Sequence, residues 1–330
     1  MKKTLKIISG FLISALFVYL AFRRIDVSEA LSVFFSVNIY YVLLSLAVSI
    51  LGLFVRSFRW RILLSYQEKA KEMPVANFFE ATCVGQMINN VLPFRMGDIA
   101  QAVFLAIKQG FSKSAVFSTV IMERLVDIFP PMIIIFLGSF FVLLPESIGT
   151  GRVFIVMGIV VFGLAFLMFF QSHLKAILKK IFPKEGKFSE RLHKLIDHFY
   201  LAAGFLKDKK RLIPVLLFTV LLWSVYALSA YFLMLSVNLN RGYFGGMLVL
   251  GITAIGVAIP SSPGYIGTWE FFCILALRIL KIKKSMALSF AILYHLMSYI
   301  PVTLIGAVVL FKSGISFAKL EESVTTDTVE

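Results

Sequence analysis

Three ionisable residues, Glu123, Arg124 and Asp127, lie within five consecutive positions of a long apolar run. Glu123 and Asp127 are four residues apart and would share a helix face, while Arg124 can pair with Asp127 three positions later. An Arg or Asp at the centre of a membrane-spanning helix costs about 2.5–3.5 kcal/mol. The cluster is therefore either an internal ion pair that only fixes packing or the wall of a polar cavity. Arg95 and Asp98, which also interrupt an apolar run, favour the cavity.

Two apolar runs are interrupted by the same residue types at the same spacing. Pro93 precedes Gly97 by four residues, Pro263 precedes Gly267 by four, and the two pairs are 170 residues apart. Proline removes a backbone donor and glycine relaxes the backbone, so each run is expected to break into two helices. In a membrane protein, matched interruptions in two halves point to a binding site built from an internal repeat.

The residues around these interruptions predict a site for an anion. A broken helix directs free N–H groups at whatever lies beyond its N-terminus. Asn90 and Ser262 add uncharged donors, and Gly264 and Gly267 let the backbone approach a ligand closely. Arg95 can hold a phosphate through two parallel hydrogen bonds.

Two carboxylates accompany these donors. Asp98 and Glu270 are interpreted as counter-charges to Arg95 and Arg124, or as ligands for a cationic head group. His295 occupies a position in the second half that corresponds to the Glu123–Asp127 region of the first, where the other polar residues are uncharged. It is either a hydrogen-bonded core residue or a proton carrier.

The composition places these groups in a membrane. The chain has 330 residues, of which 59% are hydrophobic and 15% charged, with a mean hydropathy of +0.89. A soluble domain exposes far more charge. The 33 Lys and Arg against 18 Asp and Glu are interpreted as loop charge that sets topology, not as a nucleic-acid surface. Cys83 and Cys273 lie in apolar segments as small buried residues, and neither a metal site nor a cofactor is expected.

We predict an all-α polytopic membrane protein with six full transmembrane helices and two broken-helix re-entrant hairpins, about eight segments in all. The full spans, each near the ~20 residues that cross a bilayer, are Leu5–Phe22, Ile39–Phe58, Ser114–Leu144, Arg152–Gln171, Leu212–Ser236 and Met286–Phe311. The hairpins are Val75–Lys108 and Tyr243–Ile279. Residues 1–320 form one transmembrane domain, an inverted repeat with halves 1–148 and 149–320, followed by a disordered polar tail, 321–330.

The positive-inside rule orients this arrangement. The basic stretch Lys175–Arg211 is predicted to be cytoplasmic, and six crossings then place both termini in the cytoplasm. Arg278–Lys284 conflicts with the rule, because the re-entrant hairpin leaves it outside. Residues 192–206 have the apolar spacing of an amphipathic helix, lying on the inner leaflet or serving as a connector. Arg56, Arg59, Trp60 and Arg61 are interpreted as an interfacial anchor, with a first phosphate contact as the alternative.

Three motifs together resemble the flippase-like family, the transmembrane region of lysylphosphatidylglycerol synthase and its stand-alone relatives. They are Asn90-x-Leu92-Pro93-x-Arg95-x-Gly97-Asp98, Glu123-Arg124-x-x-Asp127 and Pro263-Gly264-x-x-Gly267-x-x-Glu270. The resemblance covers residues 5 to 311 and implies a multi-pass bacterial inner-membrane protein that moves a lipid between leaflets. Two positions depart from the family pattern: Asp98 stands where Glu is usual, and Gln101 where Arg is common.

The expected function is thus that of a lipid translocase. Arg95 and Arg124 would receive a phosphate, and the four carboxylates would balance charge or receive an amine. The expected partners are the bilayer and an anionic or aminoacylated phospholipid, with self-association left open and no nucleic acid. The chain ends about 20 residues after the last span, so the lysyl-transfer activity of the full synthase is not carried over. The alternatives are a membrane-embedded head-group transferase and a lipid-binding scaffold that transports nothing.

Overall fold

The computed structural model describes residues 15–21, 36–92, 95–141, 151, 155, 158, 162–163, 186–259, 261–316 and 320. Throughout these residues the chain is helical or irregular, without a β-strand. The principal elements are α3 (Ile39–Leu64), α4 (Glu68–Glu72), α5 (Val75–Val91), α6 (Met96–Gln109), α7 (Lys113–Asp127), α8 (Phe129–Phe141), α10 (Gly186–Ala203), η1 (Gly204–Leu206), α11 (Lys209–Ser236), α12 (Gly242–Ala258), η2 (Pro263–Tyr265), α13 (Thr268–Ile279) and α14 (Lys284–Ser313). The prediction of an all-α protein is confirmed.

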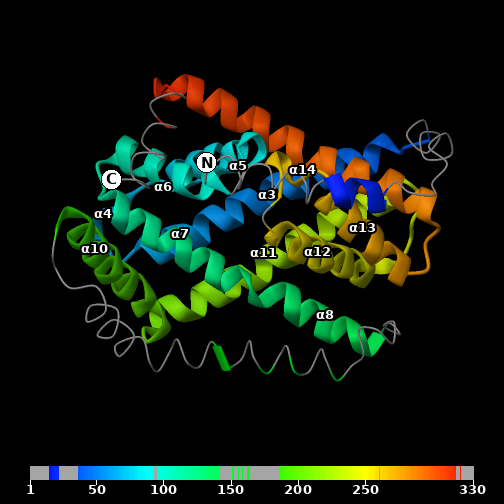
Figure 1. The fold of residues 1–330 in the computed structure, drawn as a ribbon, viewed down its shortest axis with the longest axis horizontal. Coiled ribbons are helices and arrows are strands. Elements are labelled where there is room, and N and C mark those ends of the chain that lie inside the picture. The colour runs from blue at the N-terminus through cyan, green and yellow to red at the C-terminus, as the bar shows by residue number, and fades with distance from the viewer. Residues whose placement is uncertain are drawn as a thin grey trace.

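Among the described residues, three helices are long and apolar enough to cross a membrane: α3, α11 and α14, of 26, 28 and 30 residues. In Figure 1, α3 runs through the middle of the molecule, while α14 lies along one edge and α8 and α10 along the opposite one. Two of the predicted spans, Leu5–Phe22 and Arg152–Gln171, lie largely outside the described residues. So do the loop 142–150 and the tail 321–330.

Helices α3 and α11 pack side by side through small hydroxyl residues. The Ser45 hydroxyl donates to the Ser229 carbonyl oxygen, and the Ser229 hydroxyl donates to the Ser45 carbonyl oxygen, each at 2.9 Å. Small polar residues of this kind allow two helix backbones to approach closely in lipid. Helices α3 and α11 lie at the centre of the molecule, and other helices pack against them (Figure 1).

Both predicted helix breaks are present. The first separates α5 from α6, which begins after Arg95 in the left-handed conformation (φ 55°). Pro93 itself lies outside the described residues. The second break separates α12 from α13, with η2 between them and glycines at positive φ, Gly264 at 68° and Gly267 at 88°. Left-handed backbone is strained for most L-residues, so glycine suits these two positions.

Each break folds its two helices against one another. Helix α5 packs on α6, and α12 packs on α13. The approach of α5 and α6 depends on glycine, because a Cβ added at Gly97 would lie 1.9 Å from the Gly85 carbonyl oxygen. The side-chain oxygen of Asn89 also accepts a hydrogen bond from the Gly97 N–H at 2.8 Å. The arms have 17, 14, 17 and 12 residues, shorter than the ~20 that span a bilayer.

The span predicted at Ser114–Leu144 is interrupted at Ile128, and two helices occupy this stretch. Helix α7 ends at Asp127, and α8 starts at Phe129 with Pro130 and Pro131 in its first turn. Proline is tolerated in a first turn, where the missing N–H would have no partner, but not in a helix interior. From the sequence, Pro130 and Pro131 predict a kink within one span, and the structure interrupts the helix two residues before Pro130.

The predicted amphipathic segment 192–206 is helical, as α10 and η1. Helix α10 packs against α7, and its Ile196, Ala202 and Ala203 are buried. Because protein already covers this apolar face, the arrangement favours the connector interpretation over a helix lying on lipid.

Candidate functional site

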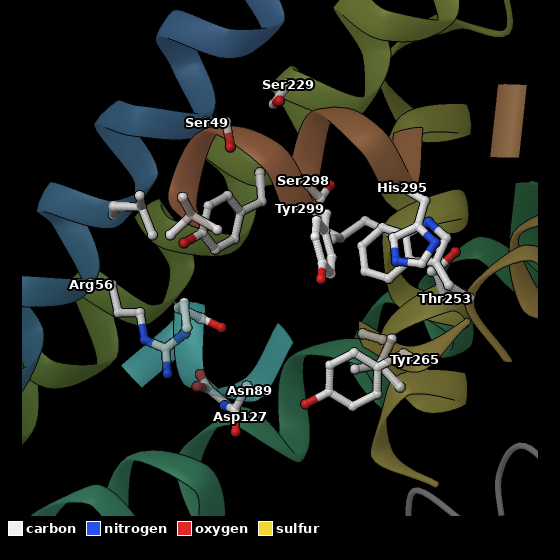
Figure 2. A pocket seen from close by; sticks show the side chains of 18 of the residues that line it. Ser49, Arg56, Asn89, Asp127, Ser229, Thr253, Tyr265, His295, Ser298 and Tyr299 are labelled. Atoms are coloured by element: carbon white, nitrogen blue, oxygen red, sulfur yellow. The ribbon is translucent and has the colours of Figure 1, made fainter. Parts of the chain in front are cut away.

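A cavity of about 410 Å³ lies where α3, α5, α7, α11, α12 and α14 converge. Its charged lining residues are Arg56, Arg95, Asp98, Arg124 and Asp127. Much of the remaining wall is apolar, including Leu46, Ile50, Leu53, Leu222, Leu250 and Ile305. Figure 2 shows Arg56, Asn89 and Asp127 on one side of the space and His295 and Thr253 on the other. A cavity with one charged side and long apolar walls suits an amphiphile.

The charged side is a network of arginines from α3 and carboxylates from α7. Arg59 donates two hydrogen bonds to Asp127, at 2.6 and 2.9 Å, and a third to Glu123 at 3.2 Å. Arg56 Nε donates to the same Glu123 oxygen at 2.6 Å. The side chains of Arg59 and Glu123 are fully buried. Buried charges are tolerated only when paired in this way.

The interfacial-anchor interpretation of this segment is therefore wrong for Arg56, Arg59 and Trp60. Trp60 is fully buried and donates to the Thr119 hydroxyl at 2.9 Å, while Arg61 stays near the surface. The spacing of these arginines in the sequence already indicates such a network. Arg56 and Arg59 are three residues apart on one helix face, which complements two carboxylates four apart on another.

Arg124 connects α7 to the start of α6. Its Nη2 lies 3.1 Å from an Asp98 oxygen, whereas its predicted partner in the same helix, Asp127, is 3.9 Å away. The Asn89 amide also donates to Asp98, at 3.2 Å. Asp98 lies in the first turn of α6, where the helix dipole favours a negative charge. The prediction that Asp98 is a counter-charge to Arg124 is confirmed.

The arginines that line the cavity retain donors for a ligand, including a buried Nε of Arg124 without a hydrogen-bond partner among the described residues. The Arg56 side chain is only 7% exposed, and its Nη2 is buried without a hydrogen-bond partner in the described part of the chain. Arg95 donates to the Val257 carbonyl oxygen at 3.2 Å, and no described carboxylate lies within 4.0 Å of it. Arg56, Arg95 and Arg124 all line the cavity. A buried guanidinium donor without an acceptor is costly, which indicates that the cavity is suited to an anion.

The two hairpin breaks lie next to each other, as predicted. The Asn90 amide donates to the Thr303 hydroxyl at 2.7 Å, and the Tyr299 hydroxyl donates to the Asn90 carbonyl oxygen at 3.1 Å. A Cβ added at Gly264 would lie 2.7 Å from the Tyr299 ring and 3.4 Å from the Asn90 oxygen. Gly264 thus permits η2 to contact both α14 and the end of α5.

Glu270 has a different partner from the one expected. It does not pair with Arg95 or Arg124, because its Oε1 lies 2.6 Å from His295 Nδ1. Its Oε2 accepts a hydrogen bond from the Gly267 N–H at 2.7 Å, which completes half of a capping box at the start of α13. His295 lines the cavity and Glu270 lies behind it.

The structure therefore divides the eleven predicted site residues into two groups. Those that line the cavity are Asn90, Arg95, Asp98, Arg124, Asp127, Gly264 and His295. Those that are buried behind it are Glu123, Ser262, Gly267 and Glu270. Aromatic residues are abundant in this chain, and their positions alone do not indicate a site. The predicted site residues therefore did not include the aromatic lining residues Trp223, Tyr226, Tyr265, Trp269, Tyr294 and Tyr299.

Residues 7–306 match the family described as the lysylphosphatidylglycerol synthase TM region. The chain belongs to this family. A UPF0104 membrane protein of Pyrococcus horikoshii is 26% identical, covering 95% of this chain and 98% of that protein. A UPF0104 membrane protein of Methanocaldococcus jannaschii is also 26% identical (89% and 91% covered), and a second from the same organism is 27% identical (68% and 93% covered). No solved structure matches the chain.

Membership of this family agrees with the long apolar helices, and the chain is a multi-pass membrane protein. The three relatives are archaeal, whereas the sequence analysis expects a bacterial membrane. Their names state only that they are membrane proteins.

Proposed function

We propose that this protein moves a phosphate-bearing phospholipid, or a similar amphiphile, between the leaflets of a cell membrane. One observation carries the proposal. The cavity is lined both by Arg56 and Arg95, which have donors available for a ligand, and by walls that are largely apolar. The planar guanidinium fork matches a phosphate, and the apolar walls match acyl chains.

The charge balance of the cavity supports an anionic head group. Four arginines (Arg56, Arg59, Arg95 and Arg124) face three carboxylates (Asp98, Glu123 and Asp127), which leaves one positive charge when all are ionised. All three carboxylates already form ion pairs with arginines. An amine on an aminoacylated head group would therefore fit better against the aromatic residues on the other side, such as Trp269 and Tyr299, through cation–π contacts.

The hairpins support a transport cycle. Because their arms are shorter than a bilayer is thick, we infer that α5–α6 and α12–α13 are re-entrant, entering and leaving on the same side. Broken backbone at membrane depth is stable only where protein or water satisfies it. In an inverted repeat with both termini in the cytoplasm, rocking of one half against the other would open the cavity to each leaflet in turn.

Reconstitution tests this function. The protein is placed in vesicles of phosphatidylethanolamine and phosphatidylglycerol that carry fluorescent phosphatidylglycerol, and bleaching of the outer leaflet reports exchange. Faster exchange than in empty vesicles is expected. Mass spectrometry of the extracted lipid separates the alternatives: a changed head group indicates a transferase, and bound but unmoved lipid indicates a scaffold.

Arg56→Lys makes the test more specific. Lysine keeps the positive charge but lacks the guanidinium group, whose Nε donates to Glu123 while Nη2 remains available for a ligand. Loss of one charge-assisted hydrogen bond is expected to weaken phosphatidylglycerol binding by about 1.5–3 kcal/mol. Arg61→Lys is the matched control, since it makes the same change near the end of the same helix, outside the cavity. Equal binding and exchange by the two variants would contradict the proposed head-group site.

A further inference from the structure

His295 is held between two hydrogen-bond acceptors. Its Nε2 lies 2.7 Å from the Gly264 carbonyl oxygen, and its Nδ1 lies 2.6 Å from Glu270 Oε1. A carbonyl oxygen can only accept, so Nε2 carries a proton. A second proton must lie between Nδ1 and Oε1, because two lone pairs would repel at this distance. The pair is either an imidazolium beside a carboxylate or a neutral imidazole beside a carboxylic acid.

Both forms contain one proton more than a neutral histidine beside an ionised glutamate. With that proton the pair has no net charge, and without it the pair has a charge of −1. The surroundings leave the proton a route, because the imidazole lines the cavity while Glu270 is buried behind it. The ring stacks on Trp269 with centroids 5.0 Å apart, which fixes its orientation.

The groups around the pair are mostly uncharged. Those on the packed elements are Thr253 from α12, Tyr265 from η2, Cys273 from α13, Tyr294 and Tyr299 from α14, and Asn90 from α5. The charged residues that line the same cavity are Arg56, Arg95, Asp98, Arg124 and Asp127. Glu270 is thus the ionisable group in direct contact with His295, at 2.6 Å.

We propose that the Glu270–His295 pair is a proton-binding site whose occupancy is coupled to binding of the anionic head group. This inference rests on the proposed function. The arginine network has one positive charge in excess. When the Glu270–His295 pair loses its proton, the pair becomes negatively charged and offsets the positive charge that attracts the head group. Head group and proton therefore favour each other's binding, and thermodynamic linkage makes this effect reciprocal.

The same proton controls a contact between the two hairpins. Without it, the imidazole cannot donate to both Gly264 and Glu270, so one of these hydrogen bonds is lost. Gly264 belongs to η2, which contacts Asn90 at the end of α5 in the first hairpin and Tyr299 of α14. Release of the proton loosens η2 and with it one wall of the cavity, which links the protonation state to the opening of the transport path.

Calorimetry of short-chain phosphatidylglycerol binding to the purified protein, in two buffers of different ionisation enthalpy, counts the linked protons. At pH values where the unliganded pair has lost its proton, binding is expected to take up a proton, and affinity is expected to fall by up to about tenfold per pH unit. His295→Gln and Glu270→Gln should bind without proton uptake, and His198→Gln, the same change outside the cavity, should behave as the parent. Binding by the parent without proton exchange, at a pH where the unliganded pair has lost its proton, would overturn the coupling.

Nitrogen-15 NMR of the histidine rings, with His295→Gln assigning the signal, reports the proton without any lipid. At neutral pH, His295 should be doubly protonated, or singly protonated at Nε2 with an infrared band of a protonated Glu270 that Glu270→Gln removes. A neutral ring beside an ionised Glu270 would overturn the proposal. If binding of phosphatidylglycerol is coupled to the proton but no lipid moves between leaflets, the proposed translocase function is refuted, while the proposed proton site is supported.

Discussion

Arg59 and Asp127, 68 positions apart in the sequence, form a two-bond ion pair in the interior of the helical bundle. The pair joins α3 to the end of α7, next to the break at which α8 begins. It holds one wall of the cavity in place, and the neighbouring Arg56 keeps a donor for a ligand because Arg59 satisfies most of the carboxylate oxygens.

Breaking this pair should be strongly destabilising. Asp127→Asn leaves Arg59 without its main counter-charge, and we expect the free energy of unfolding to fall by about 3–5 kcal/mol. The double variant Arg59→Met, Asp127→Leu should recover much of this loss. Thermal unfolding in detergent measures both. Glu68→Gln, which breaks an exposed pair with Lys71, should change stability by less than about 1 kcal/mol.

Neutralising Glu123, Arg124 and Asp127 together is expected to be severe, because it strands Arg56 and Arg59 as well. A quintuple variant that also replaces these two arginines by Met should fold better than the triple variant. It should nevertheless fail to bind phosphatidylglycerol. Binding by a folded quintuple variant would show that the head-group site lies elsewhere.

Arg95→Lys should weaken binding of phosphatidylglycerol without affecting the fold. Lysine keeps the charge but loses the planar fork, which we expect to reduce the binding free energy by about 1–2 kcal/mol. Affinity is measured by calorimetry and folding by thermal stability. Unchanged affinity would remove Arg95 from the phosphate site.

Gly97→Ala should prevent α5 and α6 from packing. The added Cβ would meet the Gly85 carbonyl oxygen at 1.9 Å and the Asn89 backbone nitrogen at 2.6 Å, and both are rigid backbone atoms. Overpacking of this kind costs at least about 1–3 kcal/mol. Gly204→Ala meets only a side-chain atom at 3.6 Å and is the control. Equal melting temperatures for the two variants would contradict the close helix contact.

Cysteine labelling from either side of the membrane tests the topology. Cysteines introduced at Lys187 and near both termini should react from the cytoplasm, and one at Ile148 from outside. Lys281→Cys addresses the conflicting basic cluster. Reaction from outside supports a re-entrant α12–α13, and reaction from the cytoplasm means that this hairpin crosses. An external C-terminus would refute the inverted repeat.

The start of α11 should loosen at low pH. The Asp208 carboxylate caps this helix by accepting hydrogen bonds from Lys210 N–H and Arg211 Nε, and Arg211 lowers the pKa of Asp208. Because the folded-state pKa lies below the unfolded one, the stabilisation is present at neutral pH and is lost as the pH falls through the folded-state value. Hydrogen exchange of the first turn should show this loss. Asp208→Asn, which still caps but does not titrate, should abolish it.

The sequence by itself determined where the helices break and which residues are unusual. Pro263, Gly264 and Gly267 act on their own backbone, so local chemistry is sufficient to place the second break. The cost of burying charge likewise marks Arg95 and Asp127 without knowledge of the fold. The same reasoning predicted an interruption at Pro130 as a kink within one span, whereas the structure ends α7 at Asp127 and begins α8 at Phe129.

Only the tertiary structure decided which of these residues meet. Spacing within a helix shows that two side chains share a face, but not which helix packs against that face. Arg59 therefore could not be matched with Asp127, nor Glu270 with His295, before the packing of α3 on α7 and of α13 on α14 was known. Ion pairs between helices depend on the register at which their surfaces interdigitate, and that register is set by contacts summed over the whole bundle.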